Sequence, residues 1–268
     1  MKMDGNSKRK LSKRKDPELA LSYYKSEGYP TESVVEYIMT ILNSNFEDWR
    51  RANPDAPIND FKFTTKKMNA AGSLFDLAKL CDVSKNIISR WSAEKVYEET
   101  AEWAKEFDSE FYGEFTANPD FTKAVLAIGR GGNKPRKDFA VWSEVKGYMG
   151  FMFDKYYNAE GEYPQGFEPA LIADVLKAYL AAYSPEDDQS AWFDKMKDVA
   201  EKFGFAREMK EYKANPDAYK GSIGDISSFV RVAITGKQNA PDLYTVMNIL
   251  GENKSRERIE KQMERLGG

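Results

Sequence analysis

The amino-acid sequence predicts a mainly α-helical protein of packed helical bundles, with little or no sheet. Apolar residues recur every three to four positions over most of the 268 residues, which is the spacing of one helix face. Strands do not alternate with helices in the way that a parallel sheet requires. The hydrophobic content of 41% and the aromatic content of 13% can supply a core, and the length favours about two domains.

The first two helices are predicted from their start signals. Asp16 and Pro17 suit the cap and the first position of a short helix that reaches about Tyr24. Thr31 is the predicted cap of a second helix, whose apolar residues share one face. These residues are Val34, Val35, Ile38, Met39, Ile41 and Leu42.

The following part of the chain is less regular. Residues 43–57 are rich in Asn, Asp and Pro and predict a loop. Phe61 and Phe63 alternate with polar residues, which fits one short strand and equally a loop with two buried aromatic side chains. Two short helical segments are predicted over residues 74–80 and 83–91.

Clearer helices follow. Ser92 is predicted to cap one helix, and Asn118, followed by Pro119, is predicted to cap the next. Residues 130–137 form a glycine-rich basic turn. A further helix is predicted over residues 141–156, where apolar residues return in phase.

Residues 158–166 combine Gly, Pro and polar side chains, so they predict a linker. Ser190 and Asp225 are the predicted N-caps of two later helices, and Gly204 and Gly236 their predicted ends. Four apolar helices and a polar terminal helix are predicted after the linker, over residues 171–180, 192–203, 226–234, 241–251 and 255–266.

The composition excludes several kinds of site. Cys81 is the only cysteine and the chain has no histidine, so an intrachain disulfide, a Cys/His zinc site and a Ser-His-Asp arrangement are excluded. No metal site is predicted. No apolar run approaches the roughly 20 residues that span a membrane, and no apolar segment follows the basic N-terminus as in a secretory signal. We therefore expect a cytoplasmic protein without membrane contact.

A strongly basic stretch, residues 7–17, organises the N-terminus. Its lysines can contact polyphosphate oxygens, and a loop that leads directly into a helix start is a favourable place for an anion. A solvated tail or a non-specific nucleic-acid patch would explain the same charges. The net charge of −3 means that an RNA partner would have to meet local basic surface on an acidic body.

The residues from Lys10 to Arg14 resemble the KMSKS-type loop of class I aminoacyl-tRNA synthetases. Several later stretches are similar to bacterial glutamyl-tRNA synthetase, in family order. They are Gly28-Tyr29-Pro30, Tyr37 to Trp49, Leu74-Phe75-Asp76-Leu77 with Lys79-Leu80, Arg231 to Gly236, Pro241 to Tyr244, and Leu250-Gly251. The loop alone would be a weak signal, whereas the ordered series is a specific one.

The resemblance implies a domain order. It comprises a KMSKS-type loop segment (1–15), a stem-contact domain (16–91), and an α-helical anticodon-binding region in two parts (92–157 and 167–268) divided by the linker. The His-rich HIGH signature of the family's nucleotide-binding domain is absent from this sequence. We therefore expect the C-terminal half of such an enzyme, inactive alone, with the N-terminal catalytic domain as a partner.

The resemblance also implies the roles of the loop residues. Lys13 matches the second lysine of the motif and is expected to contact ATP phosphates, with Lys10 and Ser12 as further ATP-binding residues. Leu11 and Arg14 depart from the usual Met and Ser. The parent enzyme would use ATP with Mg²⁺ to activate glutamate, and no cofactor is expected on this half alone.

For RNA, the resemblance implies binding of tRNA(Glu) by a monomer, with recognition of the anticodon by the helical end. Cations that face phosphates and surfaces that stack on unpaired bases are needed for this. The candidates are Arg130, Lys134, Arg136, Lys137, Arg231, Lys237, Arg256 and Arg258. A solvated loop and an exposed helix face would explain the same residues.

A second hypothesis is a free-standing, non-catalytic helical module that binds RNA or protein, with the residues from Lys8 to Lys15 as a disordered arm. In that case trypsin would cleave the arm freely and leave the body unaffected. A docked helix directly after the loop would favour the synthetase hypothesis.

Overall fold

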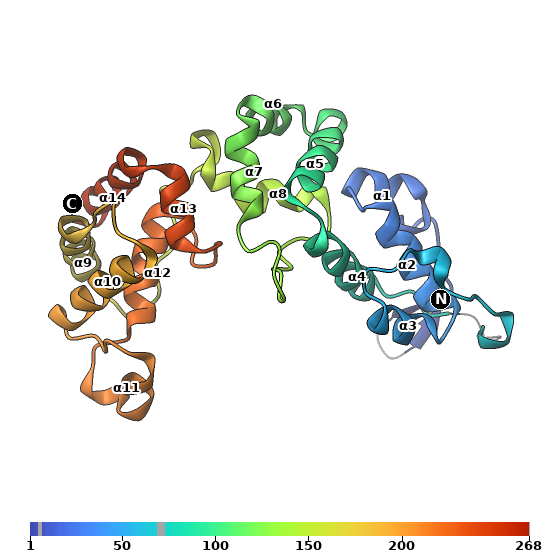
Figure 1. Cartoon of the computed structure of the whole chain (residues 1–268), viewed down its shortest axis with the longest axis horizontal. Helices are drawn as coiled ribbons and strands as arrows, with labels where there is room; N and C mark the ends of the chain where they lie inside the picture. Colours follow the sequence, from blue (N-terminus) through green and yellow to red (C-terminus); the bar gives the residue numbers. More distant parts are fainter. Residues whose placement is uncertain (5–6, 69–72, 268) are drawn as a thin grey trace. The chain divides into compact units, whose positions relative to one another are not determined.

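The computed structural model describes residues 1–4, 7–68 and 73–267 (Figure 1). It confirms the predicted fold class, because helices make up 66% of the structure and strands 2%. Within the described residues, no helix is both long and apolar enough to cross a membrane. The chain divides into two compact units, Met1–Tyr148 and Met149–Gly268. The predicted linker 158–166 lies inside the second unit.

The first unit begins with a short antiparallel pair, β1 (Lys2–Asp4) and β2 (Ser7–Arg9), in which Lys2 lies opposite Arg9. A 3₁₀ turn (Pro17–Leu19) and α1 (Leu21–Glu27) follow. The prediction that Asp16 caps a helix is wrong, because its side chain makes no capping hydrogen bond.

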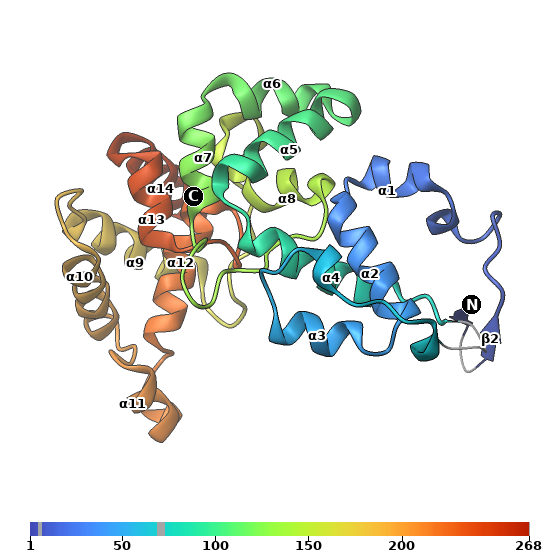
Figure 2. The same ribbon diagram turned by 45° about the vertical axis from the view of Figure 1, so that its right-hand side comes forward.

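Helices α2 (Thr31–Leu42), α3 (Phe46–Ala52) and α4 (Leu77–Arg90) lie together in the first unit (Figure 2). Thr31 is the first helical residue of α2 and not its cap. Residues 74–80 and 83–91 were predicted as separate helices, but α4 is continuous and Asp76 caps it through the amide of Lys79 at 3.2 Å.

The prediction of a loop over 43–57 is wrong, since α3 lies within it. Phe46 is buried. The centroid of its ring lies 5.0 Å from the ring centroid of Phe61 and 5.7 Å from that of Trp49. This aromatic cluster stabilises a helix that composition alone disfavours. No strand includes Phe61 or Phe63; Phe61 joins the cluster, whereas Phe63 is exposed.

The next helices are α5 (Ala93–Phe107), α6 (Ser109–Ala117) and α7 (Pro119–Ala127). The predicted caps Ser92 and Asn118 are confirmed, because each side-chain oxygen accepts a hydrogen bond from the backbone amide three residues later.

The helix predicted over 141–156 is broken. The structure has α8 (Val145–Met149) between 3₁₀ turns at Trp142–Glu144, Gly150–Met152 and Asp154–Tyr156. Glycine at positions 147 and 150 weakens a regular helix here. The apolar residues that suggested one helix face are buried by successive turns instead.

The second unit contains α9 (Pro169–Ala182), α10 (Gln189–Lys202), α11 (Met209–Ala214), α12 (Ile223–Thr235), α13 (Leu243–Leu250) and α14 (Glu252–Gly267). α14 packs against α9, α12 and α13. The caps predicted at Ser190 and Asp225 are wrong by two and three positions, because Asp188 caps α10 and Ser222 caps α12. Asp225 completes a capping box with Ser222, and α11 was not predicted.

Gly236 ends α12 as predicted, with a left-handed φ of 69°. A Cβ at this position would collide with the carbonyl oxygen of Asn158. A Cβ at Gly161 would in turn meet the carbonyl oxygen of Gly236 at 2.5 Å. Two backbone segments therefore pass so closely that only glycine fits between them.

Candidate RNA-binding surfaces and the basic loop

The basic N-terminal loop is fixed at its base by a buried carboxylate. Asp16 is 1% exposed. It accepts hydrogen bonds from Arg9 Nη1 and Nη2 at 2.6 and 2.7 Å and from the Ser12 amide at 2.7 Å. The hydrogen bond from Arg9 holds the pKa of the Asp16 carboxyl well below its usual range. The carboxylate therefore organises the loop before it, which is why it does not cap the helix after it.

Ser12 closes the loop into a turn, because its carbonyl oxygen accepts from the amides of Lys15 and Asp16 at 3.0 and 2.8 Å. Lys10 and Lys13 are exposed, and within the described residues neither forms an ion pair. The loop thus presents cations on a turn of defined backbone, an arrangement suited to phosphate oxygens.

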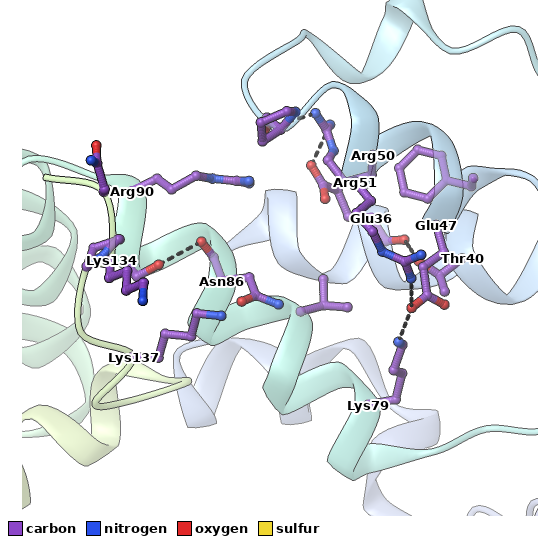
Figure 3. Close-up of a pocket in the computed structure, with 16 residues that line it drawn as sticks. Glu36, Thr40, Glu47, Arg50, Arg51, Lys79, Asn86, Arg90, Lys134 and Lys137 are labelled. Atoms are coloured by element: carbon purple, nitrogen blue, oxygen red, sulfur yellow. Dashed lines mark hydrogen bonds and ion pairs between the residues drawn. The ribbon is translucent and has the colours of Figure 1, made fainter. Parts of the chain in front are cut away.

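A groove of about 530 Å³ lies in the first unit between α2, α3 and α4 on one side and the loop 130–137 on the other (Figure 3). Its cations come from α3, α4 and the loop 130–137. They are Arg50, Arg51, Lys79, Arg90, Lys134 and Lys137. The predicted candidates Lys134 and Lys137 therefore share one surface with residues that are distant in sequence.

The groove contains paired and unpaired charges on different sides. Arg50 pairs with Glu36 at 2.6 Å, and Lys79 pairs with Glu47 at 2.7 Å. Across the described residues, no ion pair involves Arg90, Lys134 or Lys137, and all three are exposed. The acidic residues of the groove are thus neutralised and a surplus of positive charge remains.

Arg130 and Arg136, also predicted as RNA candidates, contribute to the structure of the loop. Arg130 Nη1 donates to the carbonyl oxygens of Ile88 at 2.7 Å and Trp91 at 3.5 Å, at the end of α4. Arg136 forms a bidentate pair with Asp138, at 2.6 and 3.0 Å. The Arg130 hydrogen bonds hold the loop against α4, and the Arg136 pair stabilises the end of the loop itself, so direct RNA contact by either arginine stays a prediction.

A second cavity, of about 740 Å³, lies in the second unit and contains the predicted residue Arg231. Arg231 Nη1 donates to the carbonyl oxygens of Ala240 and Pro241, at 3.1 and 2.7 Å. The half-buried ring of Phe193 lines the cavity together with polar side chains of Ser190, Asp194 and Asp242, whereas Trp192 beneath it is buried and donates its Nε1–H to Tyr179. Aromatic faces beside a guanidinium and short polar groups can hold an unstacked base.

The remaining candidates lie elsewhere in the second unit. Arg258 is 3% exposed, donates to the Ile234 carbonyl oxygen at 2.7 Å and stacks on Tyr157 with 3.9 Å between guanidinium carbon and ring centre. Burial lowers its pKa. Arg256 pairs with Glu252 at 2.7 Å, and Lys237 is exposed near Phe151.

Four arginines share one structural task. Each donates to carbonyl oxygens at or just after the end of a helix, where intrahelical partners are missing. Arg50 serves α3 at Asn53, Arg130 serves α4, Arg256 serves α9 and Arg258 serves α12. The sequence pattern missed Arg90 and Phe193 as site residues, because each looks like an ordinary helix position until the fold brings it to a cavity.

Comparisons with known proteins agree with these features. Residues 140–263 match the family model described as "Anticodon binding domain". Curated relatives are the glutamate–tRNA ligases of Acetivibrio thermocellus (47% identity over 261 residues), Clostridium perfringens strain 13 (48% over 263) and Sorangium cellulosum (40% over 258). The alignments cover 96–97% of this chain and 45–48% of the relatives.

Two solved structures share the fold at 15% identity and a TM-score of 0.59. One is a glutamate–tRNA ligase from Elizabethkingia meningosepticum in complex with its amino acid, and the other is glutamate–tRNA synthetase from Elizabethkingia anophelis. The alignments cover 99% and 98% of this chain, and 50% and 49% of those chains.

The helical fold of the second unit agrees with the match of residues 140–263 to the model of an anticodon-binding domain. The chain is homologous to the C-terminal half of bacterial glutamate–tRNA ligases, which confirms the predicted resemblance. It spans about half the length of the curated relatives that it matches. These findings support the synthetase hypothesis over a free-standing helical module.

Proposed function

We propose that this chain binds tRNA(Glu) and reads its anticodon as part of a glutamate–tRNA ligase. The observation that carries this proposal is the 47% identity to such a ligase along 97% of the chain. Similarity of that extent covers the basic loop, the first unit and the matched anticodon-binding region together. The activity itself belongs to the whole enzyme.

The cavity of the second unit supports anticodon recognition on chemical grounds. Splayed bases are recognised by stacking on aromatic rings or guanidinium planes and by hydrogen bonds to their edges. Phe193, which is half-buried, can supply a ring, and Arg231 and Asp242 a donor and an acceptor. We therefore assign base recognition to this cavity, with Arg231 as its predicted RNA contact.

The test is binding of the purified chain to a tRNA(Glu) transcript, beside the same transcript with a changed anticodon. Loss of one good base contact costs about 1 to 3 kcal/mol, so we expect the anticodon change to weaken binding roughly tenfold. The measurement is repeated at a second salt concentration to separate base from phosphate contributions. Equal affinity for both transcripts would contradict the proposal.

A matched pair of variants connects the result to the cavity. Arg231→Gln should reduce the preference for the original anticodon, because it removes a charged donor beside the aromatic faces. Lys210→Gln removes an exposed charge on α11, outside the cavity, and should leave the preference unchanged. A preference that survives in Arg231→Gln would exclude this residue from base recognition.

For the whole enzyme we propose ATP-dependent activation of glutamate and its attachment to tRNA(Glu). ATP with Mg²⁺ supplies the leaving pyrophosphate, and Lys10, Ser12 and Lys13 would hold its phosphates, which fits the exposed and unpaired lysines of the loop. We expect a cytoplasmic monomer, and expect this chain alone to bind tRNA without forming glutamyl-tRNA.

Lys13→Ala in the whole enzyme tests the loop. It should lower glutamate-dependent exchange of pyrophosphate into ATP by roughly 100-fold, the typical cost of one transition-state donor. The same change in this chain should leave affinity for tRNA nearly unaltered. Unchanged exchange would remove Lys13 from the ATP site.

A further inference from the structure

We propose that the groove lined by α2, α3, α4 and the loop 130–137 binds the phosphodiester backbone of the bound tRNA, with Arg90, Lys134 and Lys137 as its phosphate ligands. The inference rests on the proposed function, since it assumes that tRNA is the partner. It assigns the first unit a binding site that contacts the RNA independently of the anticodon sequence.

The charge balance of the groove carries the first step. Its two carboxylates, Glu36 on α2 and Glu47 on α3, are satisfied by Arg50 of α3 and by Lys79 at the start of α4. The three cations named above have no carboxylate partner within the described parts of the chain. Figure 3 shows them on the opposite side from those pairs. An anion in the groove therefore meets positive charge without displacing an ion pair.

The chemistry of the lining carries the second step. Base recognition needs an exposed aromatic platform, and the one aromatic residue that lines this groove, Phe46, is only 1% exposed. Asn86 and Asn133 add amide groups beside the cations. Exposed guanidinium, ammonium and amide groups favour phosphate and ribose oxygens over base faces.

The rigidity of the loop carries the third step. Arg130 ties its start to the end of α4, and the Arg136 amide donates to the Gly129 carbonyl oxygen at 3.0 Å, which closes its base. Lys134 and Lys137 are thus presented beside Arg90 before any ligand arrives. Such preorganisation reduces the entropy that binding must overcome.

The test replaces all three ligands by glutamine, as Arg90→Gln, Lys134→Gln and Lys137→Gln in one chain. A control chain loses the same charge at exposed first-unit lysines outside the groove, as Lys62→Gln, Lys66→Gln and Lys105→Gln. Both chains are compared with the original by circular dichroism, to establish that they fold, and by fluorescence anisotropy with labelled tRNA(Glu).

Each phosphate contact accounts for roughly a threefold loss of affinity between about 50 and about 200 mM salt. We expect the groove variant to lose two to three such contacts. The factor by which its affinity falls between the two salt concentrations should therefore be about tenfold to 30-fold smaller than the factor measured for the original chain. Its preference for the original anticodon should persist. The control should keep most of the original salt dependence.

The outcomes separate this inference from the proposed function. Absence of anticodon preference in the original chain would count against the proposed function. A groove variant that matches the control in affinity and salt dependence would overturn the groove inference alone. Calorimetry with ATP provides a further arm, because a binding heat that disappears in the groove variant would assign the groove to a free nucleotide and overturn the RNA assignment.

Discussion

Replacement of Arg258 by methionine should destabilise the second unit without a direct effect on RNA. The Arg258 guanidinium is buried, donates to the carbonyl oxygen at Ile234 and stacks on Tyr157. Methionine fills much of the same volume but offers no donor. The carbonyl at the end of α12 is therefore left without this partner.

The magnitude follows from those contacts. A buried carbonyl that loses its hydrogen bond costs about 1 to 3 kcal/mol, and a desolvated cation–π contact contributes up to about 2 kcal/mol. Part of this is offset, because methionine removes a buried charge whose carboxylate partner, Asp154, lies 3.5 Å away and is largely exposed. We expect a net loss of about 3 kcal/mol in the free energy of unfolding.

The control is Arg256→Met on the same helix. Arg256 is more exposed and its ion pair with Glu252 spans one helical turn, so its replacement should cost about 1 kcal/mol. Urea unfolding is followed by hydrogen exchange of peptides from α12 and α14, which report on the second unit. Equal losses in the two variants, or a loss below about 0.5 kcal/mol for Arg258→Met, would refute the assigned structural role.

Two further changes test the loop and the close backbone approach. Because Arg9 lowers the pKa of Asp16, the ion pair should protect the loop amides from exchange fully above about pH 4, and this protection should decline progressively as pH falls from there toward the lowered pKa of the carboxyl. Asp16→Asn should lack this protection even at pH 7, and a variant as protected as the original chain would contradict the role of the ion pair. Gly236→Ala should cost about 2 to 4 kcal/mol in urea unfolding, from a left-handed φ and a collision with Asn158. Gly204→Ala, just after α10, shares the positive φ but places its Cβ no closer than 3.8 Å to the Lys220 side chain, so a cost as large as that of Gly236→Ala would disprove the collision.

Regular helices were predictable from the sequence because burial and spacing agree within them. α9 and α12 carry apolar residues on a continuous face and end at clear stop signals, such as Gly236. α3 was missed because its stability comes from contact between Phe46, Trp49 and Phe61. Local composition cannot report a cluster that forms only in the folded chain.

The candidate sites were predictable to a smaller extent. Lys134 and Lys137 stood out as charges in a glycine-rich turn, and Arg231 stood out through the family resemblance. Arg258 looks equally exposed in the sequence, within a polar helix, yet it is buried. Arg90 gave no signal, since its groove exists only after α4 meets the loop. Charge can be counted in a sequence, but its accessibility is a property of the fold.

The arginines that close helix ends affect how this chain can be altered. An exchange of arginine for lysine keeps the charge but removes the planar group that reaches two carbonyl oxygens at once. Arg256 bridges two such oxygens through Nη1 and Nη2, those of Leu180 and Tyr183. Libraries that treat the two residue types as equivalent would therefore weaken the helix end at such a position, whereas Lys134 and Lys137, which form no ion pair within the described residues, can be varied in a search for altered RNA affinity.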